Sequence, residues 1–185
     1  RCVNDFTPLE ELKEEVKAAT PDDSKVLAGR YRIERELGAG GMAIVYLAER
    51  THIGDLAAVK VMNRSVAADP ESLARFEMEA RLAASASHPN VVQIYDFGVT
   101  EEKLPFLVME YLEGPTLSEE IKRNGTFSLE RALEIFQPIC SAVAAAHASG
   151  LIHRDLKPSN IILQHIKGGG EFVKVVDFGI AKTVS

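Results

Sequence analysis

Cysteine is scarce in this 185-residue sequence, and its scarcity excludes two kinds of protein at the outset. The only cysteines are Cys2 and Cys140, far apart in the chain. Neither belongs to a Cys-x-x-Cys motif or lies at metal-ligand spacing from a histidine. The sequence therefore predicts neither a disulfide framework nor a zinc site.

Long apolar runs are also lacking. The longest apolar-leaning stretch, Phe136 to Ala148, is interrupted by polar residues and by Pro138, and it is too short to cross a bilayer. No membrane span is predicted within this chain. The chain has no initiator methionine, and its first residues do not form a basic-then-apolar export signal. We expect it to be a piece of a longer reading frame.

Positive charge is in deficit, with 21 Lys and Arg against 27 Asp and Glu and a formal net charge of −6. This balance argues against a surface that neutralises nucleic-acid phosphates or anionic lipid headgroups. Hydrophobic residues make up 46% and charged residues 26%, close to globular averages. A packed globular protein that does not bind nucleic acid is predicted, and any phosphate site must be local.

The first half of the chain predicts a small sheet with one main helix. Residues 1–24 predict a helix capped by Thr7 and then a polar linker. A second helix is predicted from a cap at Asp69 to about Ala86, because apolar residues recur there at helical spacing. The predicted strands are Tyr31–Leu37, Ile44–Glu49, Ala57–Met62, Val91–Phe97 and Pro105–Glu110.

The second half begins with a helical pattern. A short helix is predicted near Leu117–Arg123 and a long one from a Ser128 cap to about His147. Two short strands, Ile161–Leu163 and Phe172–Val176, flank a glycine-rich turn. The apolar residues at helical spacing in the long helix are Leu129, Ala132, Leu133, Phe136, Ile139, Val143 and Ala146.

A glycine-rich segment, Leu37 to Val45, lies between two predicted strands. The dinucleotide fingerprint requires a following helix and the Walker P-loop requires Gly-Lys-Ser/Thr, so both are disfavoured. Glycines between strands let backbone N–H groups close over nucleotide phosphates, although a flexible hairpin is the simpler reading.

Lys60, in the next strand, has two readings. It is either on the solvated side of the sheet or a charge aimed at phosphates and held by a helix glutamate. Periodicity does not choose between Glu77 and Glu79 as that glutamate.

The segment His153-Arg154-Asp155-Leu156-Lys157-Pro158-Ser159-Asn160, followed by Asp177-Phe178-Gly179, resembles the catalytic loop and the Asp-Phe-Gly element of protein kinases. The likeness covers roughly residues 30–185. It implies an α+β, protein-kinase-like fold: a small antiparallel-sheet N-lobe with one main helix and the beginning of a helical C-lobe. The domains expected are an extension at 1–24, the N-lobe and hinge at 25–112, and the start of the C-lobe at 113–185.

The resemblance implies a role for each matching residue. Asp155 would take the proton of the substrate hydroxyl, and Lys157 would steady the γ-phosphate. Asn160 and Asp177 would hold magnesium ions. The pattern Arg75-Phe76-Glu77-Met78-Glu79-Ala80 selects Glu79 as the ion-pair partner of Lys60.

The same resemblance implies an ATP site and a class of substrate. The expected ATP-binding residues are Gly38, Ala39, Gly40, Gly41, Val45, Ala58, Lys60, Met109, Glu110, Leu112 and Ile162. Met109 would be the gatekeeper, and Glu110 to Leu112 the hinge. The form Asp155-Leu156-Lys157-Pro158 resembles serine/threonine kinases, especially bacterial ones, so the expected partner is a protein with Ser or Thr acceptors. We expect a cytoplasmic location, with membrane anchoring of the parent protein through a downstream segment as the alternative; a dimer partner is not identified.

His153 is expected to be structural, and Arg154 resembles the arginine that pairs a phosphorylated activation segment. Ala43 stands where the family has a third glycine, so we expect a stiffer loop and a raised KM for ATP. Only Ile180 to Ser185 follow the Asp-Phe-Gly element, so we expect residues 1–185 alone to transfer phosphate poorly. The alternatives are a nucleotide-binding pseudokinase or inactive regulatory fragment, and a small-molecule phosphotransferase with a kinase-like fold.

Overall fold

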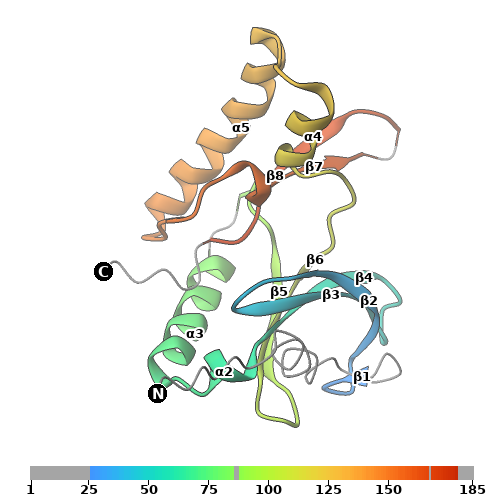
Figure 1. Cartoon of the computed structure of the whole chain (residues 1–185), viewed down its shortest axis with the longest axis vertical. Helices are drawn as coiled ribbons and strands as arrows, with labels where there is room; N and C mark the ends of the chain where they lie inside the picture. Colours follow the sequence, from blue (N-terminus) through green and yellow to red (C-terminus); the bar gives the residue numbers. More distant parts are fainter. Residues whose placement is uncertain (1–25, 86–87, 167, 179–185) are drawn as a thin grey trace, which may run out of the picture.

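The computed structural model describes residues 26–85, 88–166 and 168–178, apart from the side chains of Arg75, Glu79 and residues 81–85. Figure 1 shows one large sheet with a helix beside it and, at the other end, two helices with a two-stranded hairpin. This arrangement is the predicted α+β fold. The predicted helix within residues 1–24 and the chain after Phe178 lie outside the described residues.

The large sheet is antiparallel throughout, with strand order β1-β2-β3-β4-β6-β5. Its register sets Val45 opposite Lys60 and Ala58 opposite Met109, so predicted ATP-site residues from three strands become neighbours. The strands are β1 (Val26–Leu27), β2 (Tyr31–Ala39), β3 (Ala43–Arg50), β4 (Leu56–Met62), β5 (Ile94–Val99) and β6 (Pro105–Glu110).

Most predicted strands are confirmed, but β5 begins at Ile94 and not at Val91. The preceding residues pair elsewhere: Val92 N–H donates to the Val175 carbonyl at 2.9 Å, and Val175 N–H donates to the Asn90 carbonyl at 2.8 Å. Residues 90–92 therefore lie along β8 (Glu171–Val175), which itself begins and ends one residue earlier than predicted. β1 and the short helix α2 (Arg64–Ala67) were not predicted, because elements so short show no periodicity.

Helix α3 (Pro70–Ser85) packs on the sheet through the part of its predicted apolar stripe whose side chains are described. Asp69 caps it, because its carboxylate accepts from Ser72 N–H at 3.0 Å. Phe76 and Ala80 are buried, and the Phe76 ring lies 5.8 Å from that of Phe97. The helix is thereby fixed against β5.

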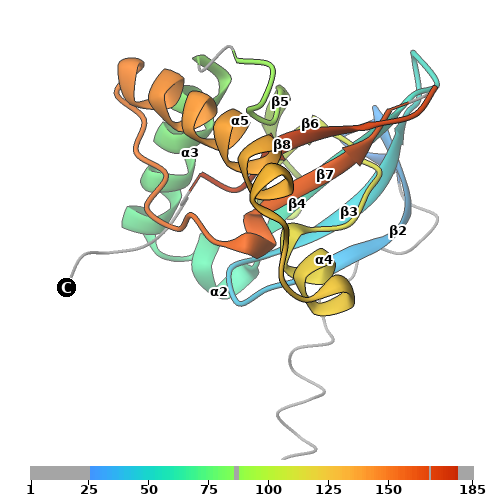
Figure 2. The same ribbon diagram turned by 90° about the horizontal axis from the view of Figure 1, so that it is seen from above.

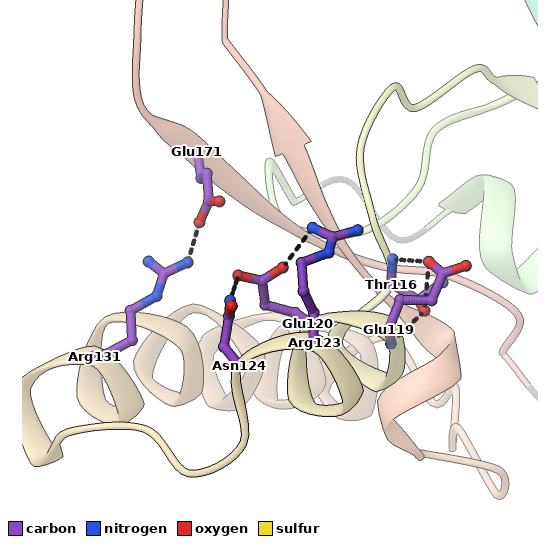
Figure 3. A network of polar contacts seen from close by, with 7 residues as sticks. All are labelled: Thr116, Glu119, Glu120, Arg123, Asn124, Arg131 and Glu171. Atoms are coloured by element: carbon purple, nitrogen blue, oxygen red, sulfur yellow. Dashed lines mark hydrogen bonds and ion pairs between the residues drawn. The ribbon is translucent and has the colours of Figure 1, made fainter.

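The other half of the molecule contains α4 (Leu117–Asn124), α5 (Leu129–Ala148) and the hairpin β7 (Ile161–His165)–β8 (Figure 2). Thr116 and Glu119 form a reciprocal capping box at the start of α4 (Figure 3). Ser128 caps α5 as predicted, and α5 continues through Pro138. Figure 3 also shows the ion pair between Arg131 and Glu171, which joins α5 to β8.

The predicted apolar stripe of α5 is partly wrong. Its buried residues are Ile135, Ile139, Ala142 and Ala146, which pack with apolar residues of the hairpin such as Leu163 and Val175. Leu129, Leu133 and Phe136 were assigned to the same stripe but are 72%, 48% and 55% exposed. The apolar surface of α5 is therefore wider than the face that contacts the hairpin. None of the helices in the described ranges is long and apolar enough to span a bilayer.

Candidate active site

A cavity of about 780 Å³ lies between the sheet and the β7–β8 hairpin. It collects residues from the glycine-rich turn, β3, β4, the end of β6 and the hairpin. The predicted ATP-binding residues all line it: Gly38, Ala39, Gly40, Gly41, Val45, Ala58, Lys60, Met109, Glu110, Leu112 and Ile162. Its walls therefore combine apolar side chains, a glycine-rich backbone and charged groups.

Other residues of the cavity wall were not predicted. Leu37, Met42 and Ala43 adjoin the glycines, and Val176 directly precedes Asp177, so their sequence neighbours could have indicated them. Val92 carried no such signal, because it reaches the cavity only through the pairing of residues 90–92 with β8. Tyr111, within the predicted hinge, also lines the cavity, and the further unpredicted lining residues are Gly114 and Ser159.

The glycine-rich turn is held in place by Asn63, just after β4. The Asn63 side-chain amide donates to the carbonyls of Gly40 and Gly41, at 3.1 and 3.0 Å. Ala43 is buried as the first residue of β3, opposite Met62, and its φ is not positive. The alanine methyl therefore causes no backbone strain where the family has a glycine.

Lys60 reaches across the cavity to the segment after β8. Its ammonium lies 2.6 Å from a carboxylate oxygen of Asp177, with the two side chains 14% and 42% exposed. The reading of Lys60 as a solvated surface lysine is therefore wrong. The predicted pair with Glu79 lies outside the described side chains.

Three residues of the predicted catalytic loop, Asp155, Lys157 and Asn160, form one polar cluster. Lys157 Nζ lies 2.7 Å from a carboxylate oxygen of Asp155, whose side chain is 20% exposed. The buried Asn160 side-chain amide donates to the Asp155 backbone carbonyl at 2.9 Å. Val176 N–H donates to the Asn160 carbonyl at 2.9 Å, which brings the catalytic loop beside Asp177.

His153 holds this loop from inside the protein. Its ring is buried against the Phe178 ring, with centroids 4.6 Å apart. Nε2 lies 3.0 Å from the Val176 carbonyl and therefore donates, while Nδ1 accepts from Asp155 N–H at 3.4 Å. Burial lowers the pKa of the imidazole below its ordinary value, so the neutral form is favoured. These contacts support a structural role for His153.

Two residues of the site have strained backbones. Arg154 and Asp177 have φ values of 56° and 54°, in the left-handed region that residues other than glycine adopt infrequently. Such strain persists only where surrounding contacts fix the chain, and it concentrates at functional sites. Arg154 directly precedes Asp155 of the polar cluster, and Asp177 pairs with Lys60.

Comparison with known proteins gives the family of the chain. The protein kinase domain model matches residues 31–185. The serine/threonine-protein kinase PrkC of Bacillus subtilis is 45% identical over 161 residues, which are 87% of this chain and 24% of PrkC. The probable serine/threonine-protein kinase PknB of Lactococcus lactis is 46% identical, over 87% of this chain and 25% of PknB. The chain thus spans about a quarter of the length of these two relatives.

Solved structures show the same relationship. The crystal structure of the PknI kinase domain of Mycobacterium tuberculosis matches with a TM-score of 0.76 and 30% identity. The match covers 88% of this chain and 64% of that domain. Together with the cavity and the polar cluster beside it, these likenesses establish that the chain belongs to the protein kinase domain family.

Proposed function

We propose that this chain carries the ATP site and the catalytic loop of a serine/threonine protein kinase, which transfers the γ-phosphoryl group of ATP to hydroxyl groups of proteins. The observation that carries the proposal is that the cavity wall contains both Lys60 and Asp177, with Asp155 and Asn160 hydrogen-bonded beside them. The relatives' names as serine/threonine kinases support the choice of acceptor.

The cavity suits a nucleotide. Its volume of about 780 Å³ falls in the range typical of small-molecule sites. Val45, Ala58 and Ile162 supply apolar surface for the adenine ring, and the backbone from Glu110 to Leu112 supplies hydrogen-bonding groups. The glycine-rich turn and Lys60 would face the phosphates, and Glu79 is the proposed helix partner of Lys60.

Asp177 and Asn160 fit a magnesium ion, because a carboxylate and an amide oxygen are the hard ligands this ion prefers. The Asn160 amide nitrogen is engaged with Asp155, which leaves the amide oxygen for a cation. When bound, magnesium would offset the negative charge of the phosphates during transfer.

Asp155 is the proposed base: it would orient the substrate hydroxyl and accept its proton. Lys157, 2.7 Å away, would place a positive charge beside the transferring group. Arg154 is proposed to pair a phosphate on the activation segment. We place the reaction in the cytoplasm, where ATP is available. No feature in the described part of the site favours a pseudokinase, since Lys60 and the residues of the cluster are all present.

The proposal is tested with the full-length protein, radiolabelled ATP and magnesium, and a generic protein acceptor. Asp155→Asn should lower phosphoryl transfer by about 10²-fold or more while ATP binding persists. Asp55→Asn is the matched control, because Asp55 pairs with Arg50 outside the cavity wall and should leave transfer intact. Undiminished turnover by Asp155→Asn would rule out Asp155 as the base. Failure of the wild-type protein to bind ATP would refute the proposed function.

A further inference from the structure

Lys174 and Glu110 form a largely buried ion pair that the kinase motifs do not explain. Lys174 Nζ lies 2.5 Å from Glu110 Oε1, and the two side chains are only 11% and 15% exposed. Lys174 is one of few buried charged residues in the described part of the chain. A charge in such surroundings is costly unless it is paired, so the position of each side chain depends on the other.

The pair joins two functional parts of the site. Glu110 is the last residue of β6 and lines the cavity as the first residue of the proposed hinge. Lys174 lies in β8, opposite Ile162 of the cavity wall and three residues before Asp177. Since β6 and β8 belong to different sheets, the ion pair is a direct side-chain link between them.

Neighbouring backbone groups fix the pair further. The same Glu110 oxygen accepts from Gln93 N–H at 2.7 Å, and Glu110 N–H donates to the Gln93 carbonyl at 2.9 Å. Lys174 Nζ also lies 3.5 Å from the Val91 carbonyl. The hinge, residues 91–93 and β8 therefore meet at one carboxylate.

Stability alone is a weak explanation for this arrangement. The desolvation of two charges offsets most of their attraction, so an apolar pair of similar volume stabilises a fold as well or better. An ion pair with several hydrogen bonds adds a defined geometry. Here that geometry relates the hinge to β8, the strand that leads into Asp177.

We infer that Lys174 and Glu110 are positioning residues, which set the hinge at a fixed place relative to Asp177 so that one nucleotide can contact both. This inference rests on the proposed function. Adenosine would need only the hinge end of the cavity, whereas magnesium-bound ATP would need both ends in register. The pair should therefore contribute to the affinity for ATP with magnesium far more than to the affinity for adenosine.

The test measures the dissociation constants of adenosine and of ATP with magnesium, by calorimetry on the full-length protein. Lys174→Met removes the charge but keeps an unbranched side chain. It should weaken ATP binding by about tenfold, the effect of losing one contact to a charged group of the ligand, and leave adenosine binding nearly unchanged. Glu110→Gln is the milder variant, because its amide oxygen still accepts from Gln93 N–H, and it should act in the same direction. Arg131→Met is the control: it breaks the other ion pair of β8, with Glu171, away from the cavity wall.

The preference for ATP over adenosine is the deciding quantity. A preference that falls in Lys174→Met and Glu110→Gln, but not in Arg131→Met, supports the inference. A preference equal to that of the wild type in the folded variants overturns it, even if their melting temperatures fall, because the pair is then only structural. Should Lys174→Met not fold, Glu110→Gln decides alone. A wild-type protein without any preference for ATP would refute the proposed function itself.

Discussion

The buried histidine of the catalytic loop predicts an acid-sensitive fold. Both ring nitrogens of His153 are engaged as in the neutral tautomer: Nε2 donates to the Val176 carbonyl, and Nδ1 accepts from Asp155 N–H. Protonation of Nδ1 would place its new N–H against the Asp155 N–H, and it would bury a cation beside Phe178. Burial lowers the pKa of His153, although the hydrogen bond to the Val176 carbonyl and the charges of Asp155 and Asp177 act in the opposite direction.

The sign of the effect follows from proton linkage. The unfolded chain protonates His153 near pH 6.5, whereas the folded protein binds that proton only at lower pH. The contribution of neutral His153 to stability is therefore complete above pH 6.5 and is lost as the pH falls through the pKa of the folded protein. Within that window one proton changes the free energy of unfolding by at most about 1.4 kcal/mol per pH unit.

The assay compares wild type with His153→Gln by urea denaturation at several pH values between about 7.5 and 5. Glutamine can donate to the Val176 carbonyl but takes up no proton. At pH 7.5 the variant should be less stable than the wild type by about 1–2 kcal/mol, because the ring contact with Phe178 is lost. As the pH falls the difference should shrink or reverse, while other titrating groups cancel between the two proteins. A constant difference across the range would refute the assignment of His153 as buried and neutral.

Two further predictions concern a packing contact and the glycine-rich turn. A Cβ at Gly98 would lie 2.5 Å from the buried Phe106 ring, so Gly98→Ala should destabilise the fold by about 1–3 kcal/mol. Phe106→Leu should relieve that clash, so the double variant should lose less unfolding free energy than the two single variants lose together. A loss equal to that sum would contradict the prediction. Asn63→Ala removes both side-chain hydrogen bonds to Gly40 and Gly41. It should raise the KM for ATP about fivefold, as for two hydrogen bonds of roughly 0.5 kcal/mol each, and an unchanged KM in steady-state kinetics would refute this.

Local patterns were enough to predict most of the elements. Pro105–Glu110 was predicted with its observed bounds, and the Ser128 cap of α5 is where its sequence indicates. The predicted cavity residues came from the resemblance to kinases, and the register of β3, β4 and β6 brings them together.

Features that depend on long-range contacts could not be predicted in the same way. The pattern of Val91–Phe97 fits a strand, but only the folded chain shows that Val92 pairs with Val175 and not with β6. Ile135 was missed as a buried residue of α5, because helical periodicity does not say which part of a wide apolar face meets the hairpin. The pairing of Lys174 with Glu110 joins residues 64 positions apart, and nothing local to either residue indicates the other.

The short hairpin β7–β8 has a neighbour on each side that comes from elsewhere in the chain. Residues 90–92 bond to Val175, and the segment from Glu113 to Thr116 bonds to β7, where Leu163 N–H donates to the Pro115 carbonyl at 2.9 Å. A polypeptide beginning at residue 113 would keep the segment beside β7 but would lose residues 90–92, which lie beside β8. The open side of β8 would then present unpaired backbone groups, which invite pairing between copies. Attempts to produce the catalytic-loop half of this protein alone should therefore yield aggregates unless residues 88–92 are supplied with it.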